Sequence, residues 1–77
     1  MALITDAAIG WSTPVTLTSD EIWQTRKGSV FVTTSGSPAA EDGLALHENH
    51  AVQFPAGASV RYRKEGTTQA LIVREAI

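Results

Sequence analysis

The amino-acid sequence contains no cysteine among its 77 residues. Disulfide bonds and thiolate metal sites are therefore excluded. A chain of this length buries only about 60–65% of the surface that its unfolded form exposes, and domains this small often depend on disulfides, metals or oligomerisation. Without cysteine, we expect the additional stability to come from other copies of the same chain, and a trimer is the favoured arrangement.

The sequence also lacks a strong excess of charge. Six lysine and arginine residues stand against eight aspartate and glutamate residues, a net charge of −2. Nucleic-acid binding generally requires a basic excess that neutralises phosphates, so no nucleic-acid partner is expected. The first ten residues have no basic region, and Asp6 interrupts their apolar stretch. This argues against a signal peptide and a membrane span, and no membrane partner is expected.

A sustained helical period is missing as well. Threonine, valine, alanine and serine are abundant, and turn residues recur about every 8–12 residues, a pattern typical of a β-sandwich or β-barrel. We predict an all-β fold, a compact antiparallel barrel or sandwich of about seven strands over residues 14–77. An apolar arm, residues 1–13, precedes it and has no evident partner inside the domain. The predicted strands are 14–18, 22–26, 29–35, 44–48, 51–54, 59–64 and 69–77.

Alternation along the strands predicts which side chains face the core. Val60 and Tyr62 share the inward face of one strand, and Leu44 and Leu46 face inward from another. Two corners are also predicted. Asn49 tolerates the left-handed backbone region at a two-residue hairpin corner, and Gly57 supplies the positive φ of a type II turn.

The Pro-Ala-Gly turn at residues 55–57 resembles the Pro-x-Gly turn of the second cupin motif, and the strand order over residues 23–75 is similar to that of the cupin family. The resemblance implies a small jelly-roll barrel. Cupins normally carry a metal-binding histidine three residues after the turn glycine, where this sequence has Val60, and a glycine where it has Asn49. Their His-x-His motif has no counterpart near residues 29–35. The resemblance therefore implies a barrel without its metal, and no cofactor is expected.

A second resemblance concerns the length and composition of the chain and involves no sequence motif. The short, cysteine-free, nearly neutral chain, rich in threonine, alanine, valine and glycine, is similar to the small β-domains on the outside of phage particles. This predicts a non-enzymatic structural protein of the virion, made in the host cytoplasm, that decorates or cements a capsid or forms a minor component bound to a larger shell protein. The alternative is a soluble cupin-like module that binds a small polar ligand or a metal.

His47, Glu48 and His50 form the one cluster of metal-ligand types in the sequence. We expect exposed polar residues at a hairpin tip. The alternative is a zinc site, which needs three or four ligands and would have to be completed across a symmetry axis.

Nucleophilic catalysis is not predicted. Cysteine is absent, no serine lies in a strained elbow, and neither histidine has an evident carboxylate to orient it. The chain is therefore not expected to be an enzyme.

The apolar arm supplies the first candidate interface. Ile4, Ile9 and Trp11 are expected to dock on a neighbouring copy, because exchanged arms stabilise small oligomers at little cost. Trp23 is expected in the core or in a subunit contact, because its side chain can bury on the order of 200 Å².

Basic residues supply the second candidate interface. Arg26, Lys27, Arg61, Arg63 and Lys64 make one positive face if the strands that carry them are neighbours. Such a face suits an acidic partner surface. The alternative is the ordinary polar face of an antiparallel sheet.

Overall fold

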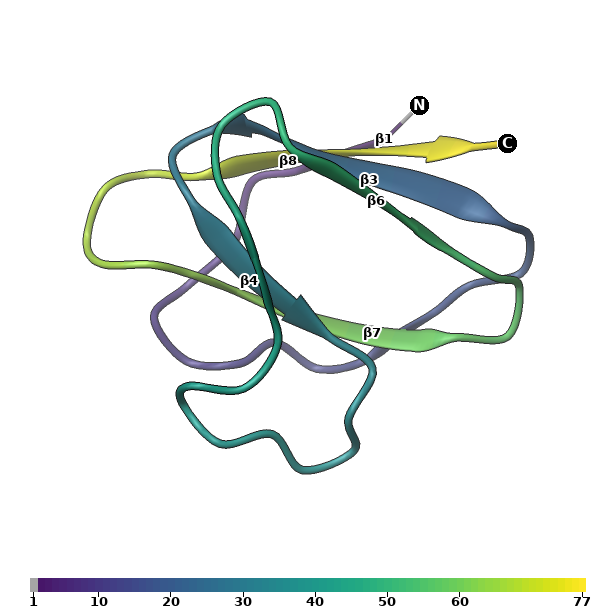
Figure 1. The fold of residues 1–77 in the computed structure, drawn as a ribbon, viewed down its shortest axis with the longest axis horizontal. Coiled ribbons are helices and arrows are strands. Elements are labelled where there is room, and N and C mark those ends of the chain that lie inside the picture. Colours follow the sequence, from purple (N-terminus) through teal and green to yellow (C-terminus); the bar gives the residue numbers. More distant parts are fainter. Residues whose placement is uncertain (1) are drawn as a thin grey trace.

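A computed structural model of the chain describes residues 2–77. These residues form two four-stranded antiparallel sheets that face each other across one apolar core (Figure 1). The all-β, antiparallel prediction is confirmed, and the two sheets form a sandwich that does not close into a barrel. No helix within residues 2–77 is long and apolar enough to cross a membrane. The strands are β1 (Ala2–Ile4), β2 (Val15–Thr16), β3 (Glu21–Lys27), β4 (Val30–Thr33), β5 (Leu44–Leu46), β6 (Ala51–Phe54), β7 (Ser59–Lys64) and β8 (Leu71–Ala76).

The strand pairing is nested. β4 pairs with β5, β3 with β6, β2 with β7 and β1 with β8, so the chain is one long hairpin folded over on itself. Two further ladders, β3 with β8 and β4 with β7, join these pairs into the sheets β1-β8-β3-β6 and β2-β7-β4-β5. Among the described residues, seven strands follow residue 13 as predicted, and the eighth is β1.

The first residues belong to the domain. Ile4 lies opposite Ile72 in the ladder of β1 with β8 and is only 9% exposed. Further along, the N–H of Lys64 donates to the carbonyl of Ala8 (2.8 Å). The expectation that this segment finds no partner within the domain is therefore wrong. β8 is a central strand of its sheet, and β1 pairs with the edge of β8 that β3 leaves free.

Alternation places the core as predicted on β7 and at Leu46 of β5, which is 6% exposed, but not at Leu44. Val60 and Tyr62 are 0% and 7% exposed between the sheets. Leu44 lies opposite the buried Val32, on the inward face, yet it is 55% exposed. It lies at the outer edge of its sheet, where no strand of the facing sheet covers it.

Both predicted corners have the expected backbone. Asn49 has φ 72° and Gly57 has φ 88°, each as the third residue of a turn. A backbone hydrogen bond between the first and fourth residues closes the two turns, at 2.9 Å and 3.2 Å. The hairpin prediction for the first corner is wrong, however, because β5 and β6 belong to different sheets. Each corner carries the chain from one sheet to the other.

Replacing Ile4 by alanine should lower the free energy of unfolding by about 2–5 kcal/mol, because a buried side chain is deleted. Leu3→Ala is the matched control, since Leu3 is on the same strand but 52% exposed, and a change within about 0.5 kcal/mol is expected there. Urea unfolding of both variants measures the difference. Equal, small effects would mean that β1 does not contribute to the folded domain.

Candidate functional site

β5 and β6 are edge strands of the two sheets and lie at the same side of the sandwich (Figure 1). Within residues 2–77, β5 pairs only with β4 and β6 only with β3, so both strands have a free outer edge. Between them is a hollow of about 360 Å³. Its lining side chains come from both sheets and carry no charge: Val32, Thr33, Thr34, Gly43, Leu44 and Phe54.

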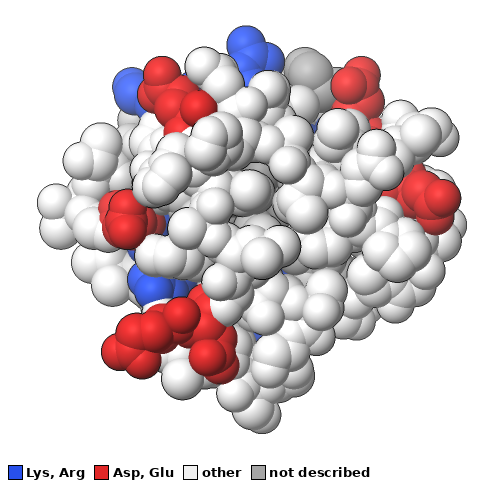
Figure 2. All heavy atoms as spheres, in the orientation of Figure 1, with Lys and Arg blue, Asp and Glu red and all other residues white. Residues whose placement is uncertain are grey.

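The middle of this side of the molecule is nearly free of charged side chains. Figure 2 views the same side and shows that lysine, arginine, aspartate and glutamate side chains gather at the margin of the face, while its middle is almost entirely without them. The sequences of β5 (Leu-Ala-Leu) and β6 (Ala-Val-Gln-Phe) contain no charged residue. Edge strands usually carry lysine, proline or a bulge that prevents pairing with another chain. We call this region, β5, β6 and the hollow between them, the β5/β6 face.

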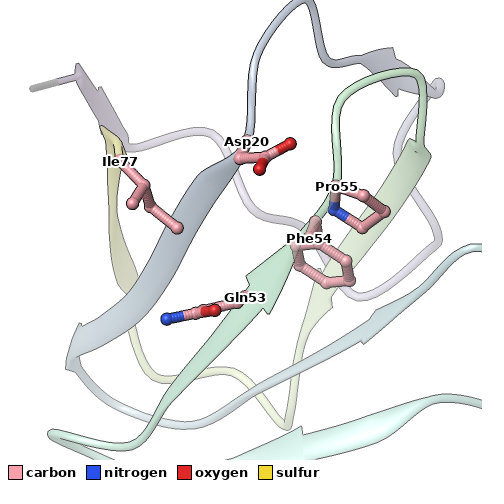
Figure 3. A pocket seen from close by; sticks show the side chains of 5 residues that line it. All are labelled: Asp20, Gln53, Phe54, Pro55 and Ile77. Atoms are coloured by element: carbon pink, nitrogen blue, oxygen red, sulfur yellow. The ribbon is translucent and has the colours of Figure 1, made fainter.

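A second hollow, of about 240 Å³, lies at the end of the first sheet. Figure 3 shows its lining: Asp20 before β3, Gln53, Phe54 and Pro55 at the end of β6, and Ile77 after β8. The Asp20 carboxylate accepts a hydrogen bond from a backbone N–H of the turn that follows Pro55 (2.8 Å). The carboxylate thus holds the turn in place, and the hollow is a structural junction.

Trp11 packs against its own chain. Its indole N–H donates to the carbonyl of Ala39 (2.8 Å), in the 34–43 loop. The Arg63 guanidinium lies between the rings of Trp11 and Phe31, with centroids at 5.3 Å and 4.2 Å. The loop ends at Gly43, whose backbone lies close to β4: its φ is 99°, and a Cβ there would be 2.6 Å from a backbone oxygen of that strand. Trp11 and Arg63 therefore fix the loop, which conflicts with the expectation that Trp11 docks on a neighbouring copy.

The basic residues do not make one face. Arg26 and Lys27 are on β3 and Arg61 and Arg63 on β7, and these strands belong to different sheets. Arg61 donates to the carbonyl of Ser12 (3.1 Å), so it too binds its own chain. The condition for a single positive face, that the two strands are neighbours, is not met.

Of the remaining interface candidates, one is exposed. Ile9 is 59% exposed, whereas Ile4 and Trp23 are 9% and 0% exposed inside their own chain. The expectation of a core position for Trp23 is confirmed, and neither buried residue is accessible to a partner.

An ion pair that the sequence analysis missed lies at the inward face of the first sheet. Arg74 donates to both carboxylate oxygens of Glu21, from Nε (2.9 Å) and from a terminal nitrogen (3.0 Å). Trp23 donates to the same carboxylate (3.0 Å), and the guanidinium lies 5.2 Å from its ring centroid. The hydrogen bonds from Arg74 hold the pKa of Glu21 below its ordinary value, although burial opposes them. The strand register that joins residues 21 and 74 could not be read from the sequence.

Tyr62 forms a further polar contact, which is partly buried. Its hydroxyl donates to the carboxylate of Asp6 (2.7 Å), and its ring lies 6.2 Å from that of Trp23. Burial, together with the bond to Asp6, raises the pKa of Tyr62 to about 12. The contact ties the segment between β1 and β2 to the core.

The histidines lie on the corner between β5 and β6, and both are exposed. The ring centroids of His47 and His50 are 5.6 Å apart. Nδ1 of His47 lies 3.1 Å from the hydroxyl oxygen of Ser29, a proximity that the sequence did not predict. Within residues 2–77 no third histidine, cysteine, aspartate or glutamate joins them in a metal-binding group. Glu48 is exposed on the same corner.

The Ser29–His47 contact has two of the three parts of a nucleophilic triad. Catalysis of that type also needs a carboxylate that orients the histidine and donors that stabilise an oxyanion. Among the described residues, His47 has no carboxylate hydrogen-bond partner. The arrangement is therefore better suited to holding the ring of His47 than to activating the serine.

Comparisons with protein-family models, with curated proteins and with solved structures found no match to this chain.

Glu21 should make the stability of the domain depend on pH. Its pKa is lower in the folded chain than the ordinary 4.5, so the unfolded chain binds the proton more readily. Ionised Glu21 stabilises the folded chain fully at pH values above 4.5. This stabilisation is lost as the pH falls through the lower pKa that Glu21 has in the folded chain. Urea unfolding between pH 7 and pH 3 should show a steeper loss for the wild type than for Glu21→Gln. Parallel curves would contradict the assignment.

Tyr62 should titrate unusually late, because its pKa is raised from 10.0 to about 12. The protonated Tyr62 hydroxyl stabilises the folded chain fully below pH 10. This stabilisation is lost as the pH rises towards 12, because the unfolded chain releases the Tyr62 proton at a lower pH than the folded chain does. The sequence has a single tyrosine, so tyrosinate absorbance follows this residue alone. Asp6→Asn should lower the midpoint in the folded chain. A midpoint near 10 in the folded wild type would show that the hydroxyl is not held.

Proposed function

We propose that this chain is a non-enzymatic structural protein of a phage-like particle, a capsid decoration, cement or minor virion protein that binds a protein lattice. The β5/β6 face carries the proposal. It combines two free strand edges, an uncharged surface and the 55% exposed side chain of Leu44. Such a face accepts an extended, uncharged segment of a partner, whose backbone adds to the sheet edge and whose side chains enter the hollow.

We further propose that the sandwich is a jelly roll of cupin-like type without a metal. The nested pairing of first strand with last, second with seventh, and so on inwards supports this, because a jelly roll is built from eight strands in two Greek keys. Val60, at the position of the cupin histidine, is fully buried among apolar side chains. The buried valine supports a role in core packing, in place of metal binding, for this position.

Association with further copies, a trimer being favoured, belongs to the same proposal. Ile9 and Ile77 are large apolar side chains that are 59% and 70% exposed. Apolar side chains of this size, exposed on so small a domain, support contacts with other copies. The protein is made in the host cytoplasm and resides in the virion under this proposal.

A second candidate is a soluble cupin-like module that binds a small polar ligand. The hollow of about 360 Å³ favours it, because the side chains of Thr33 and Thr34 line an otherwise apolar space between the sheets. Pockets for small molecules have this composition of apolar walls with a few polar groups.

Density-gradient fractionation of a lysate from the natural source tests the virion proposal. We expect the chain to sediment with large particles, in fixed ratio to a major shell protein. Recovery only as a small species at the top of the gradient would reject the proposal.

A pair of matched variants then tests the face. Leu44 and Leu3 have nearly equal exposure, 55% and 52%, but Leu3 lies on β1, at the opposite edge of the first sheet from β6. Purified Leu44→Asp should lose at least tenfold in affinity for undecorated particles, whereas Leu3→Asp should bind within about threefold of the wild type, because a buried charge in an apolar contact is costly. Equal binding of both variants would place the contact elsewhere.

A further inference from the structure

We propose that Trp11 and Arg63 are positioning residues for the β5/β6 face, because they hold the 34–43 loop, whose two ends form part of the wall of the hollow. Neither residue is among those that line the hollow. The proposal deepens the proposed function and rests on it. The observation that carries it is the position of Gly43, which lines the hollow and also lies against the ring of Trp11.

The 34–43 loop connects the two residues to the hollow. Thr34 is its first residue and Gly43 its last, and both line the hollow together with Leu44 at the start of β5. A Cβ at Gly43 would be 3.1 Å from the ring of Trp11 and 2.6 Å from the carbonyl oxygen of Val32. Gly43 is therefore close to both the Trp11 ring and β4, so a movement of that ring changes the wall of the hollow.

Trp11 and Arg63 hold the middle of the loop by two of its carbonyls. The indole N–H donates to Ala39 (2.8 Å), and a terminal nitrogen of Arg63 donates to Ala40. The guanidinium lies between the rings of Trp11 and Phe31, where cation–π attraction holds it. Nε of Arg63 is buried and has no hydrogen-bond partner within residues 2–77. The two rings and the loop carbonyl, and no polar contact of Nε, therefore keep the guanidinium in place.

The other hydrogen bonds of the loop within the described residues are local. The N–H of Ser35 donates to the hydroxyl of Thr33 (3.1 Å), and Ala39 and Asp42 bond to each other (2.8 and 3.1 Å). The strand that follows, β5, has three residues and pairs only with β4. Few contacts besides those of Trp11 and Arg63 therefore hold this region, and such regions open readily. A wall and a strand edge that are already ordered cost a binding partner less conformational entropy.

Hydrogen exchange of the isolated chain tests the first step, which requires no partner. Arg63→Ala should raise the exchange rates of the hydrogen-bonded amides within residues 39–46 at least tenfold, while the amides of β3 and β8 stay within about threefold of the wild type. Arg61→Ala is the matched control. Arg61 is on the same face of β7, two residues away, and donates to Ser12 outside the loop. Its loss should leave the exchange of residues 39–46 within about threefold.

Affinity for undecorated particles tests the second step. Arg63→Ala should bind at least tenfold more weakly than the wild type, whereas Arg61→Ala, which removes the same charge, should bind within about threefold. Trp11→Phe is a second variant in case Arg63→Ala does not fold, as judged by circular dichroism. It keeps an aromatic ring beside the guanidinium and removes the donor to Ala39, so both its loop exchange and its loss of affinity should be intermediate.

The outcomes separate this proposal from the proposed function. Unchanged loop exchange in Arg63→Ala and Trp11→Phe would show that these residues do not hold the loop and would overturn the proposal. Faster loop exchange with undiminished particle binding, or equal weakening by Arg61→Ala, would overturn it and leave the proposed function intact. Failure of the wild type itself to bind would reject the proposed function, and with it the positioning role, whatever the exchange rates show.

Discussion

The two sheets are held together around Trp23. Its ring is fully buried, edge-on to Phe54 at 5.6 Å and tilted to Tyr62 at 6.2 Å. A side chain of this size supplies much of the apolar contact available to a small core, and offset or edge-to-face aromatic pairs add to it. The carboxylate of Glu21 satisfies the indole N–H, and the Arg74 guanidinium that pairs with this carboxylate also lies by the ring. Apolar packing and the partly buried ion pair therefore both involve one residue.

The two sides of the sandwich differ in how they are closed. The segment between β1 and β2 runs along β7, joined to it by backbone bonds at Ala8 and Ser12, and the bond from Tyr62 to Asp6 fastens it further. At the other side, β5 and β6 have no such cover within the described residues. The contrast explains why the β5/β6 face, and not the first ten residues, carries the proposed contact with a partner.

Local signals predicted the fold class well. Strands with alternating side chains, such as that of Val60 and Tyr62, and the residues with positive φ, Asn49 and Gly57, follow from short-range sterics and patterning. What the sequence could not predict depends on register between distant strands. The pairing of β1 with β8, the ion pair of residues 21 and 74 and the exposure of Leu44 all require knowledge of which strands are neighbours and which lie at an edge.

The site was predicted less well for the same reason. The sequence drew attention to His47 and His50, but only the corner geometry brings their rings together and places Ser29 beside them. Trp11 looked like a residue for an external partner because its contacts in the 34–43 loop are far away in sequence. In both cases the deciding information is tertiary.

The position of β8 has a consequence for the order of events during synthesis. This strand lies between β1 and β3, although residues 71–76 are the last of the strands to be made. The first sheet cannot be completed until they have left the ribosome, and β1 has no partner in the meantime. Such long-range closure is slow compared with local pairing. The nascent chain therefore exposes the apolar faces of β1 and β3, and shielding by a chaperone during this interval would raise the yield of folded protein.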